Sequence, residues 1–348
     1  MGITRNGTAA VSRRANMREV ADLAGVAMSS VSRVLSGHPD VSADMRKRVV
    51  DAVAQLGYEP DFLAQSLRRG ATLSVGFVVG DISNPLMADI ASGAEAVLRR
   101  SGYSMLVMNS ENDPALDAAH VRFFQSRRVD GMILSLASER KKQTLDLLAQ
   151  RESAVVVIDR DIPARLGASA VLSDHRAGMD QAMAHLLDRG HRRIALVTGS
   201  LVTRPARERL NGMRDAIAGR QLTDETTYLA ESFSTEHGDA ATEALLARDP
   251  RPTAIIAGGN QLLIGCLRAL RRHDVRPGRD IALVTCDDVP LTELYDPPVA
   301  SISRDSVELG RVAAELLLRR LDRASTPETI TLPTHFVARA SAEVAIGV

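Results

Sequence analysis

Three short runs of apolar residues at helical spacing lie between residues 16 and 57. Asn16 and Glu19 form the signature of a capping box at the start of the first run, and Ser42 can cap the third. A glycine ends each of these two runs, which is typical of helix carboxyl ends. The residues expected to face inward are Val20, Leu23 and Ala24; Val31, Val34 and Leu35; and Met45, Val49, Val53 and Leu56. Three small helices with a tight Gly-Val-Ala turn between the first two predict a helix-turn-helix unit.

From residue 72 onward, short apolar stretches alternate with amphipathic runs. The expected strands are LSVGFVV, SMLVM, VDGMILS, AVVVID, RIALVTG, a short one around Tyr228, TAIIAG and DIALVTCDD. The expected helices span about 87–100, 115–127, 139–150, 174–189, 205–218, 236–248 and 260–272, with a crossover between two sets near Val171. This alternation predicts an α/β fold with two parallel sheets and helices on both faces. Since ligands bind at the carboxyl ends of such strands, two sheets in tandem predict a ligand cleft between them.

The second helical run, which begins near Met28, has an unusual outward face. Burying its valines and leucine leaves Met28, Ser29, Ser30, Ser32 and Arg33 outside. The second helix of a helix-turn-helix unit lies in the DNA major groove. Hydroxyls can bond phosphates or base edges and an arginine can bond guanine twice, whereas carboxylates would be repelled. The pattern favours a DNA-reading helix over the alternative, a serine-rich solvated helix in a small bundle.

Length and charge narrow the class of protein. A chain of 348 residues exceeds what one core usually fills, so we expect two or three domains. The net charge is zero, but residues 1–70 carry ten Lys and Arg against seven Asp and Glu, while the rest of the chain carries 33 against 36. The positive excess therefore falls on the segment with the helix-turn-helix pattern.

Targeting signals and cysteine usage are those expected of a cytoplasmic protein. The first sixteen residues are polar and basic and lack the apolar stretch of a secretory signal, and no segment has the continuous apolar length of a membrane helix. Cys266 and Cys286 could form a disulfide, but two buried small hydrophobic side chains are the favoured interpretation. No metal-type spacing occurs, so we expect no metal site.

The run MREVADLAGVAMSSVSRVLSG, followed by VSADMRKRVVDAVAQLGYEPDFLAQSLR, resembles the amino-terminal region of the lactose-repressor (LacI) family of bacterial transcription regulators. The resemblance implies base readout by a site that includes Met28, Ser29 and Arg33. Family members usually have Ser where Ala27 stands and Thr where Ser30 stands.

The resemblance also assigns a role to residues 61–70. In the family this segment is a hinge that folds on operator DNA and inserts a leucine, here Leu67, into the minor groove, which would place Arg68 near phosphates. This chain has Asp61 where the family most often has Asn. An ordinary interdomain linker is the alternative if the helix-turn-helix interpretation fails.

The resemblance continues to the end of the chain and implies a two-lobed, periplasmic-binding-protein-like effector domain with strands exchanged between its lobes. The expected organisation is a basic disordered arm at 1–15, a helix-turn-helix DNA-binding domain at 16–60, a hinge helix at 61–70, and an effector-binding and dimerisation domain at 71–348. Lobe one is expected to span about 72–171 and 303–332, and lobe two about 172–302 and 333–348.

Polar and charged residues cluster at the ends of the predicted strands, where this kind of fold places its chemistry. The candidate effector-binding residues are Asn84, Asp159, Arg160, Arg209, Phe233, Asn260 and Asp287. Carboxylates and guanidinium groups can satisfy the hydroxyls of a polyhydroxy ligand, and an aromatic ring can pack its apolar face. By resemblance, Asp159, Arg209 and Asp287 match effector contacts of sugar-responsive members, and Phe233 matches an aromatic platform.

Two departures from the family pattern bear on the ligand. Gly259-Asn260 stands where the family typically reads Asn-Asp, and Ser306 stands where some sugar-responsive members carry Phe. Two candidates also have ordinary structural alternatives, because Asn84 precedes a proline as turn residues do, and Arg160 could pair with a neighbouring aspartate.

The predicted function is a repressor that binds a palindromic operator as a homodimer and responds to a small ligand, a sugar or sugar derivative, in the cleft. An enzyme is disfavoured, because the adjacent Asp287 and Asp288 should point apart and no catalytic or nucleotide-binding motif occurs, so we expect no cofactor. A periplasmic sugar-binding protein would share the fold but would lack the DNA-binding head. A regulator that responds to a nucleoside or purine is the other alternative.

Overall fold

The computed structural model describes residues 15–35, 38–58, 70–151, 153–223, 225–322 and 325–344. The chain divides into two compact units between Thr72 and Leu73. The predicted arm before residue 15 and the predicted hinge residues 61–69, Leu67 and Arg68 among them, lie outside the described residues.

The first unit contains three helices, α1 (Met17–Ala24), α2 (Met28–Leu35) and α3 (Ala43–Leu56). The predicted capping box is confirmed, because the Asn16 side chain accepts hydrogen bonds from two backbone N–H groups of α1 and Glu19 accepts one from the Asn16 N–H, all at 3.0 Å. Ser42 caps α3 as predicted. Gly25 follows α1 with a φ of 62°, a left-handed conformation that glycine adopts at little cost.

The core of this unit confirms most of the predicted inward residues and corrects one. The fully buried side chains are Val20, Ala21, Ala24, Val31, Val34, Val49, Ala52 and Tyr58, with Leu35, Met45, Val53 and Leu56 packed against them. The prediction for Leu23 was wrong, because that side chain is 46% exposed. The buried arc of α1 is centred on Ala24, Val20 and Ala21, and Leu23 lies about 100° from its centre.

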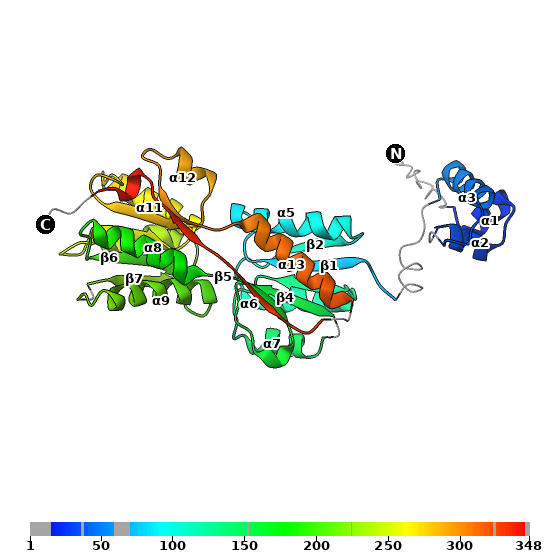
Figure 1. The fold of residues 1–348 in the computed structure, drawn as a ribbon, viewed down its shortest axis with the longest axis horizontal. Helices are drawn as coiled ribbons and strands as arrows, with labels where there is room; N and C mark the ends of the chain where they lie inside the picture. The colour runs from blue at the N-terminus through cyan, green and yellow to red at the C-terminus, as the bar shows by residue number, and fades with distance from the viewer. Residues whose placement is uncertain are drawn as a thin grey trace, which may run out of the picture. The chain divides into compact units, whose positions relative to one another are not determined.

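The second unit consists of two lobes, each built on a six-stranded sheet (Figure 1). The sheet of lobe one has the order β11-β5-β4-β3-β1-β2, and that of lobe two has the order β12-β10-β9-β8-β6-β7. The strands of lobe one are β1 (Ser74–Val79), β2 (Ser104–Asn109), β3 (Gly131–Leu134), β4 (Ala154–Ile158), β5 (Ser169–Ser173) and β11 (Thr329–Leu332). Those of lobe two are β6 (Ile194–Gly199), β7 (Thr227–Glu231), β8 (Ala254–Ala257), β9 (Ala282–Cys286), β10 (Ala300–Ser303) and β12 (His335–Val337).

The strand pairing is parallel, as predicted, except that β12 runs antiparallel to β10. The chain passes between the lobes after β5, after β10 and after β11, so each lobe contains segments distant in sequence. The crossings after β10 and β11 lie close to the lobe boundaries near 302 and 332 that the family resemblance implied. The first crossing follows β5 and not Val171 itself, because Val171 lies within β5, which pairs with β4 and β11. These three crossings connect the lobes at one end of both sheets.

Helices cover both faces of each sheet (Figure 1). In lobe one, α5 (Pro85–Arg100) and α13 (Ser306–Leu321) lie on one face, and α6 (Pro114–Ser126) and α7 (Lys142–Ala149) on the other. In lobe two the two pairs are α8 (His175–Asp188) with α9 (Arg204–Gly219), and α10 (Thr235–Leu246) with α11 (Asn260–Arg272). The remaining helical elements are α12 (Pro290–Leu294), η1 (Ala164–Leu166) and η2 (Ala340–Ala342). Among the described helices, none has the length and apolarity to cross a membrane.

Helices α5 and α13 cross in direct backbone contact. A Cβ atom added to Gly310 would lie 1.9 Å from the Ile90 carbonyl oxygen, and one added to Gly93 would lie 2.0 Å from the Val307 carbonyl oxygen. Only glycine permits this approach, which closes one face of the lobe-one core.

We expect Gly310→Ala to lower the free energy of unfolding by about 1–3 kcal/mol, because the helices must move apart around the added methyl group. Urea denaturation followed by circular dichroism measures the change. Gly219→Ala is the control, because a Cβ atom at this last residue of α9 would meet nothing within 4 Å. Equal stability of the two variants would contradict the tight crossing.

Candidate functional site

A cavity lies between the two lobes at the carboxyl ends of their strands. All seven residues predicted to bind an effector line it: Asn84, Asp159, Arg160, Arg209, Phe233, Asn260 and Asp287. Its volume is about 80 Å³, several times what a single water molecule needs. The structure therefore brings the predicted residues together in one place, and their binding of an effector stays a prediction.

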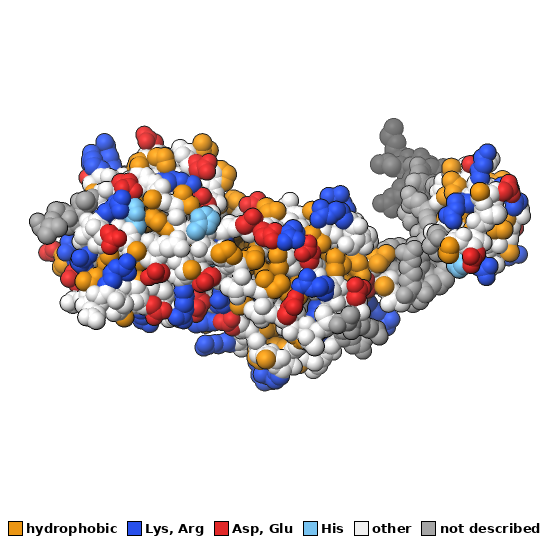
Figure 2. Space-filling model, viewed as in Figure 1, with side chains coloured by type: hydrophobic (Ala, Val, Ile, Leu, Met, Phe, Trp, Pro, Cys, Tyr) orange, Lys and Arg blue, Asp and Glu red, His pale blue; other side chains and the backbone are white. Residues whose placement is uncertain are grey.

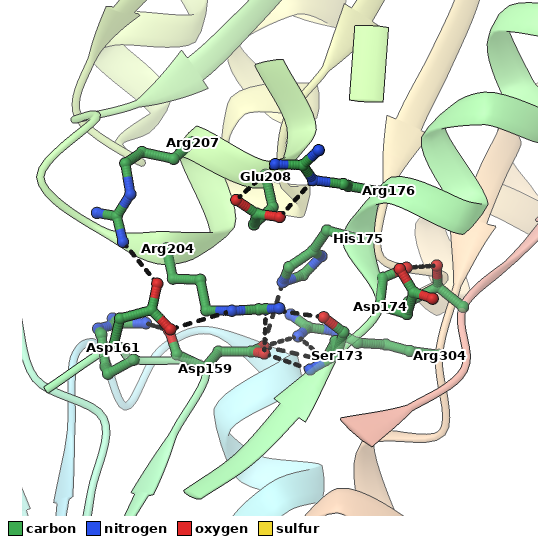
Figure 3. A network of polar contacts seen from close by, with 12 residues as sticks. Asp159, Asp161, Ser173, Asp174, His175, Arg176, Arg204, Arg207, Glu208 and Arg304 are labelled. Atoms are coloured by element: carbon green, nitrogen blue, oxygen red, sulfur yellow. Dashed lines mark hydrogen bonds and ion pairs between the residues drawn. The ribbon is translucent and has the colours of Figure 1, made fainter. Parts of the chain in front are cut away.

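Arg304 joins the two lobes at the floor of this cavity. Its guanidinium group bonds Asp159 of lobe one, and both Nε and Nη2 lie 2.9 Å from Asp287 Oδ1 of lobe two. It also donates to the Ser173 hydroxyl at 2.9 Å (Figure 3). Arg304 was not among the residues predicted from the sequence, since it stands between a strand and a helix in the unremarkable triplet Ser-Arg-Asp.

The two carboxylates occupy equivalent places in the two lobes. Asp159 follows β4 and Asp287 follows β9, each the third strand in its sheet order. Both have a positive φ, 49° and 74°, in the left-handed region that aspartate tolerates better than most residues. Such backbone conformations collect at ligand sites, where the surrounding structure holds them in place.

Charges at the cavity floor shift one another's protonation. Burial opposes ionisation of Asp159, but the surrounding groups, Arg304 among them, outweigh it and hold the pKa of this carboxyl well below its usual range. Burial likewise opposes the charge of Arg304, and Asp287 and Asp159 raise its pKa above the ordinary value. Burial lowers the pKa of His175 to about 4 although its Nε2 lies 3.4 Å from Asp159, so this imidazole is neutral at pH 7.

Arg209 reaches the cavity from α9 and is only 3% exposed. Its Nη1 donates to the Gly258 carbonyl oxygen at 2.6 Å, and its guanidinium lies over the Phe233 ring, 5.8 Å from the centroid. Its Nη2 lies 3.8 Å from Asp287, and its Nε has no hydrogen-bond partner among the described residues. This cation therefore lines the cavity and has one buried donor that no described group satisfies.

The lobes also touch through amide and charged side chains. The Asn260 side chain at the start of α11 donates to the Asn84 side chain at 2.7 Å, and Asn84 caps α5 as well. Near the cavity, Arg207 of α9 bonds Glu139 of lobe one at 2.6 Å. It also bonds Asp161 of lobe one at 2.8 Å (Figure 3). Helix α7 begins at Lys142, three residues later than predicted, and Glu139 lies before it with its side chain buried.

The structure decides three alternatives that the sequence left open, for Arg160, for Asp288 and for the two cysteines. Arg160 pairs with no neighbouring carboxylate but donates to the backbone carbonyl oxygens of Leu136 and Asp159. Asp288 points away from Asp287 as expected and bonds Arg339, with an Nη1 to Oδ1 distance of 2.7 Å. Both cysteines are free and buried, as favoured, and burial raises the pKa of Cys266 to about 11. Among the described residues, no group of His, Cys, Asp and Glu could hold a metal ion.

The outward face of α2 carries the residues predicted to contact DNA. Met28, Ser29 and Arg33 are exposed, while Ser30 and Ser32 are half-buried. The first turn of α2 has no acidic residue, and Arg33 lies in its last turn. This face is free of the carboxylates that phosphates would repel.

A helix-turn-helix unit joined to a two-lobed domain with a charged cavity defines a class of DNA-binding regulators that respond to small molecules. The comparisons place the chain within that class: it belongs to the lacI family of bacterial regulatory proteins. The family model described as bacterial regulatory proteins, lacI family, matches residues 16–61, and that of a periplasmic binding protein-like domain matches residues 183–342. The chain is therefore a DNA-binding transcription regulator with a small-molecule effector domain and not an enzyme.

Repressors from other bacteria are similar in sequence to this chain over most of its length. The ribose operon repressor of Escherichia coli K12 is 32% identical over 310 residues, which cover 88% of this chain and 93% of that protein. The HTH-type transcriptional repressor PurR of Haemophilus influenzae PittEE is 31% identical over 310 residues, which cover 88% and 91%. The crystal structure of the lac repressor dimer bound to operator and the anti-inducer ONPF matches with a TM-score of 0.84 at 25% identity, over 96% of this chain and 100% of that one.

We expect Arg304→Met to lower the free energy of unfolding by about 3–5 kcal/mol, because it leaves Asp159 and Asp287 buried without their shared cation. Urea denaturation at pH 7 measures the loss. Arg279→Met is the control, since Arg279 is exposed and pairs with the adjacent Asp280, and we expect it to leave the free energy of unfolding nearly unchanged. A similar loss in both variants would mean that the bridge does not hold the lobes together.

We expect His175→Gln to reduce the sensitivity of the protein to mild acid. The folded pKa of His175 is about 4 against an ordinary 6.5, so its contribution to stability is present above pH 6.5 and is lost as pH falls toward 4. Between pH 7 and pH 5 the free energy of unfolding of the unsubstituted protein should therefore fall by about 2 kcal/mol more than that of the variant. Urea denaturation at both pH values measures this difference, and equal losses would contradict a neutral buried imidazole.

Proposed function

We propose that this regulator is a repressor that binds a palindromic operator as a homodimer, in the cytoplasm, and that a sugar or sugar derivative in the interlobe cavity controls it. The observation that carries the proposal is the meeting of all seven predicted effector residues in one cavity of a chain that also has the helix-turn-helix unit. The named relatives support it, since one is a ribose operon repressor and another structure is a repressor dimer on its operator.

The composition of α2 supports two-fold binding to DNA. Its exposed face offers one guanidinium group, a thioether and hydroxyls, which supply few discriminating base contacts. Two such helices on inverted half-sites double the contacts and match the symmetry of a dimer. The predicted hinge residues Leu67 and Arg68 would add minor-groove and phosphate contacts.

Exposed apolar side chains on lobe one support the homodimer. Ile82, Leu106, Val107 and Val307 are exposed by 40% or more. Hydrophobic side chains gather on the lobe-one face that carries α13 (Figure 2). The Ile82 N–H donates to the Asn109 side chain at the end of β2, so the loop that carries Ile82 is tied to the edge strand that carries Leu106 and Val107. Apolar residues of this kind are those that a second copy buries in a self-complementary interface.

The proposed control is a shift between lobe arrangements. A ligand in the cavity meets both lobes, because Asn84 and Asp159 belong to one and Asn260 and Asp287 to the other. It therefore changes the relative stability of the arrangements, and in a dimer this alters how well two DNA-binding units fit two half-sites. A nucleoside or purine is the second candidate ligand.

Selection of binding sites from random duplex DNA tests the proposal. We expect the full chain to enrich a sequence with two inverted half-sites and to bind it as a dimer. Arg33→Ala should weaken binding to the selected duplex at least about thirtyfold, because one arginine contact, worth about 1–3 kcal/mol, is lost in each of the two half-sites. Lys47→Ala is the control, because Lys47 is an exposed residue of α3, and it should change the affinity less than Arg33→Ala does. Enrichment of no sequence, or of a single half-site, would overturn the proposal.

A further inference from the structure

We infer that the effector is a small polyhydroxylated anion, a sugar acid or a sugar phosphate, whose charged group binds Arg209 at the amino-terminal end of α11. The inference rests on the proposed function, because it assigns a chemical class to the ligand of the same cavity.

The first observation is the incomplete pairing of Arg209. Its side chain is almost fully buried, yet its nearest carboxylate, Asp287, lies 3.8 Å away and is bonded more closely by Arg304 at 2.9 Å. Its Nε donor has no partner among the described residues. A buried cation that shares its counter-charge with a second cation gains much from a further anion, and a carboxylate or phosphate can accept two hydrogen bonds from one guanidinium group.

The second observation is how the other charged groups of the cavity are balanced. Arg304 is placed between Asp159 and Asp287, so neither carboxylate is left to attract a cationic ligand. Arg160 donates from Nε and Nη1 to the backbone carbonyl oxygens of Leu136 and Asp159. Among the described arginines that line the cavity, Arg209 is the one with a buried donor nitrogen that has no hydrogen-bond partner.

The third observation concerns the helix ends at the cavity. Helices α5, α9 and α11 all place residues of their first turn in its wall, and none of the three has an acidic residue in that turn. Gly259 precedes α11 and offers no side-chain cap to its first N–H groups. In contrast, α10 and α13 carry Glu236 and Glu308 in their first turns. Asn84 caps α5, and the first N–H of α9 donates to Glu139, so of these three ends it is that of α11 that lacks a side-chain partner. An amino-terminal end of this kind favours an anion, and here it coincides with the incompletely paired guanidinium group of Arg209.

The acidic residues near the entrance do not cancel this preference. Asp81 lines the cavity edge, and Glu111 and Glu236 line an adjoining open groove. The two glutamates are exposed, where water and salt screen their charges. The Asn84 and Asn260 amides, which bond each other, and the Phe233 ring line the same cavity, where they can meet the hydroxyls and the apolar face of the same ligand.

Matched ligand sets test the inference on the full chain. Isothermal titration calorimetry in low salt compares D-ribose with D-ribonate and D-ribose 5-phosphate, and D-glucose with D-gluconate and D-glucose 6-phosphate. We expect an anion in at least one set to bind at least tenfold more tightly than its neutral parent. The acid and the phosphate arms show which anion the protein prefers.

Two variants of α9 assign the preference to a residue. Arg209→Gln should reduce the ratio between anion and neutral parent to less than threefold, whereas Arg214→Gln should leave it unchanged. Arg214 is the matched control, because it lies on the same helix over the Tyr228 ring, 5.4 Å from the centroid, and does not line the cavity. If Arg209→Gln does not fold, Arg209→Lys replaces it, and we expect the ratio to fall because the planar pair of donors is lost.

Three results would overturn the inference: equal or tighter binding of the neutral parents, an anion preference that survives Arg209→Gln, or no binding in either set by protein that still binds its selected duplex. The last result leaves the proposed function standing, whereas failure to select any duplex contradicts that function and not the chemistry of the cavity.

Discussion

The effector domain depends on one arginine held between two buried carboxylates. Arg304 is 7% exposed in its side chain, and Asp159 and Asp287 are 5% and 6% exposed. None of the three charges could be buried alone at acceptable cost, so each is tolerated because the others are present. Since one carboxylate belongs to each lobe, the electrostatic requirement of the cavity floor is also the connection between the lobes.

The residues that connect the lobes at the cavity floor also bond the segments in which the chain passes from one lobe to the other. Arg304 itself lies just after β10, where the second crossing begins, and it donates to Ser173 at the first. Thr334, at the third, donates to the Asp174 carbonyl oxygen at 2.6 Å and accepts from the Gly178 N–H at 3.0 Å. Cavity floor and crossings therefore form one hydrogen-bonded network. In the proposed function, an anionic ligand competes with Asp159 and Asp287 for the cavity arginines and so changes bonds close to the crossings between the lobes.

Patterns within short stretches of the sequence predicted the features that depend on short-range interactions along the chain. The capping box at Asn16, the outward face of α2 and the residues at strand ends each depend on spacing within one element or on a strand followed by a helix. Arg304 could not be found in this way, because its role follows from β10 lying beside β9 and from the lobes meeting. The prediction that Leu23 is buried was wrong for a related reason. Helical spacing is compatible with two inward faces of α1, and the packing of α1 against α2 and α3 buries the face that leaves Leu23 exposed.

The division of work between the two units follows from how little each can do alone. A recognition helix with one arginine and several hydroxyls distinguishes few bases, so in the proposed dimer the affinity depends on two heads engaging together. Regulation then needs no structural change within the helix-turn-helix unit, whose core consists mainly of buried valines and alanines. It is enough that the lobes of two copies shift relative to each other, and the charged cavity floor is the place where a small ligand can cause that shift.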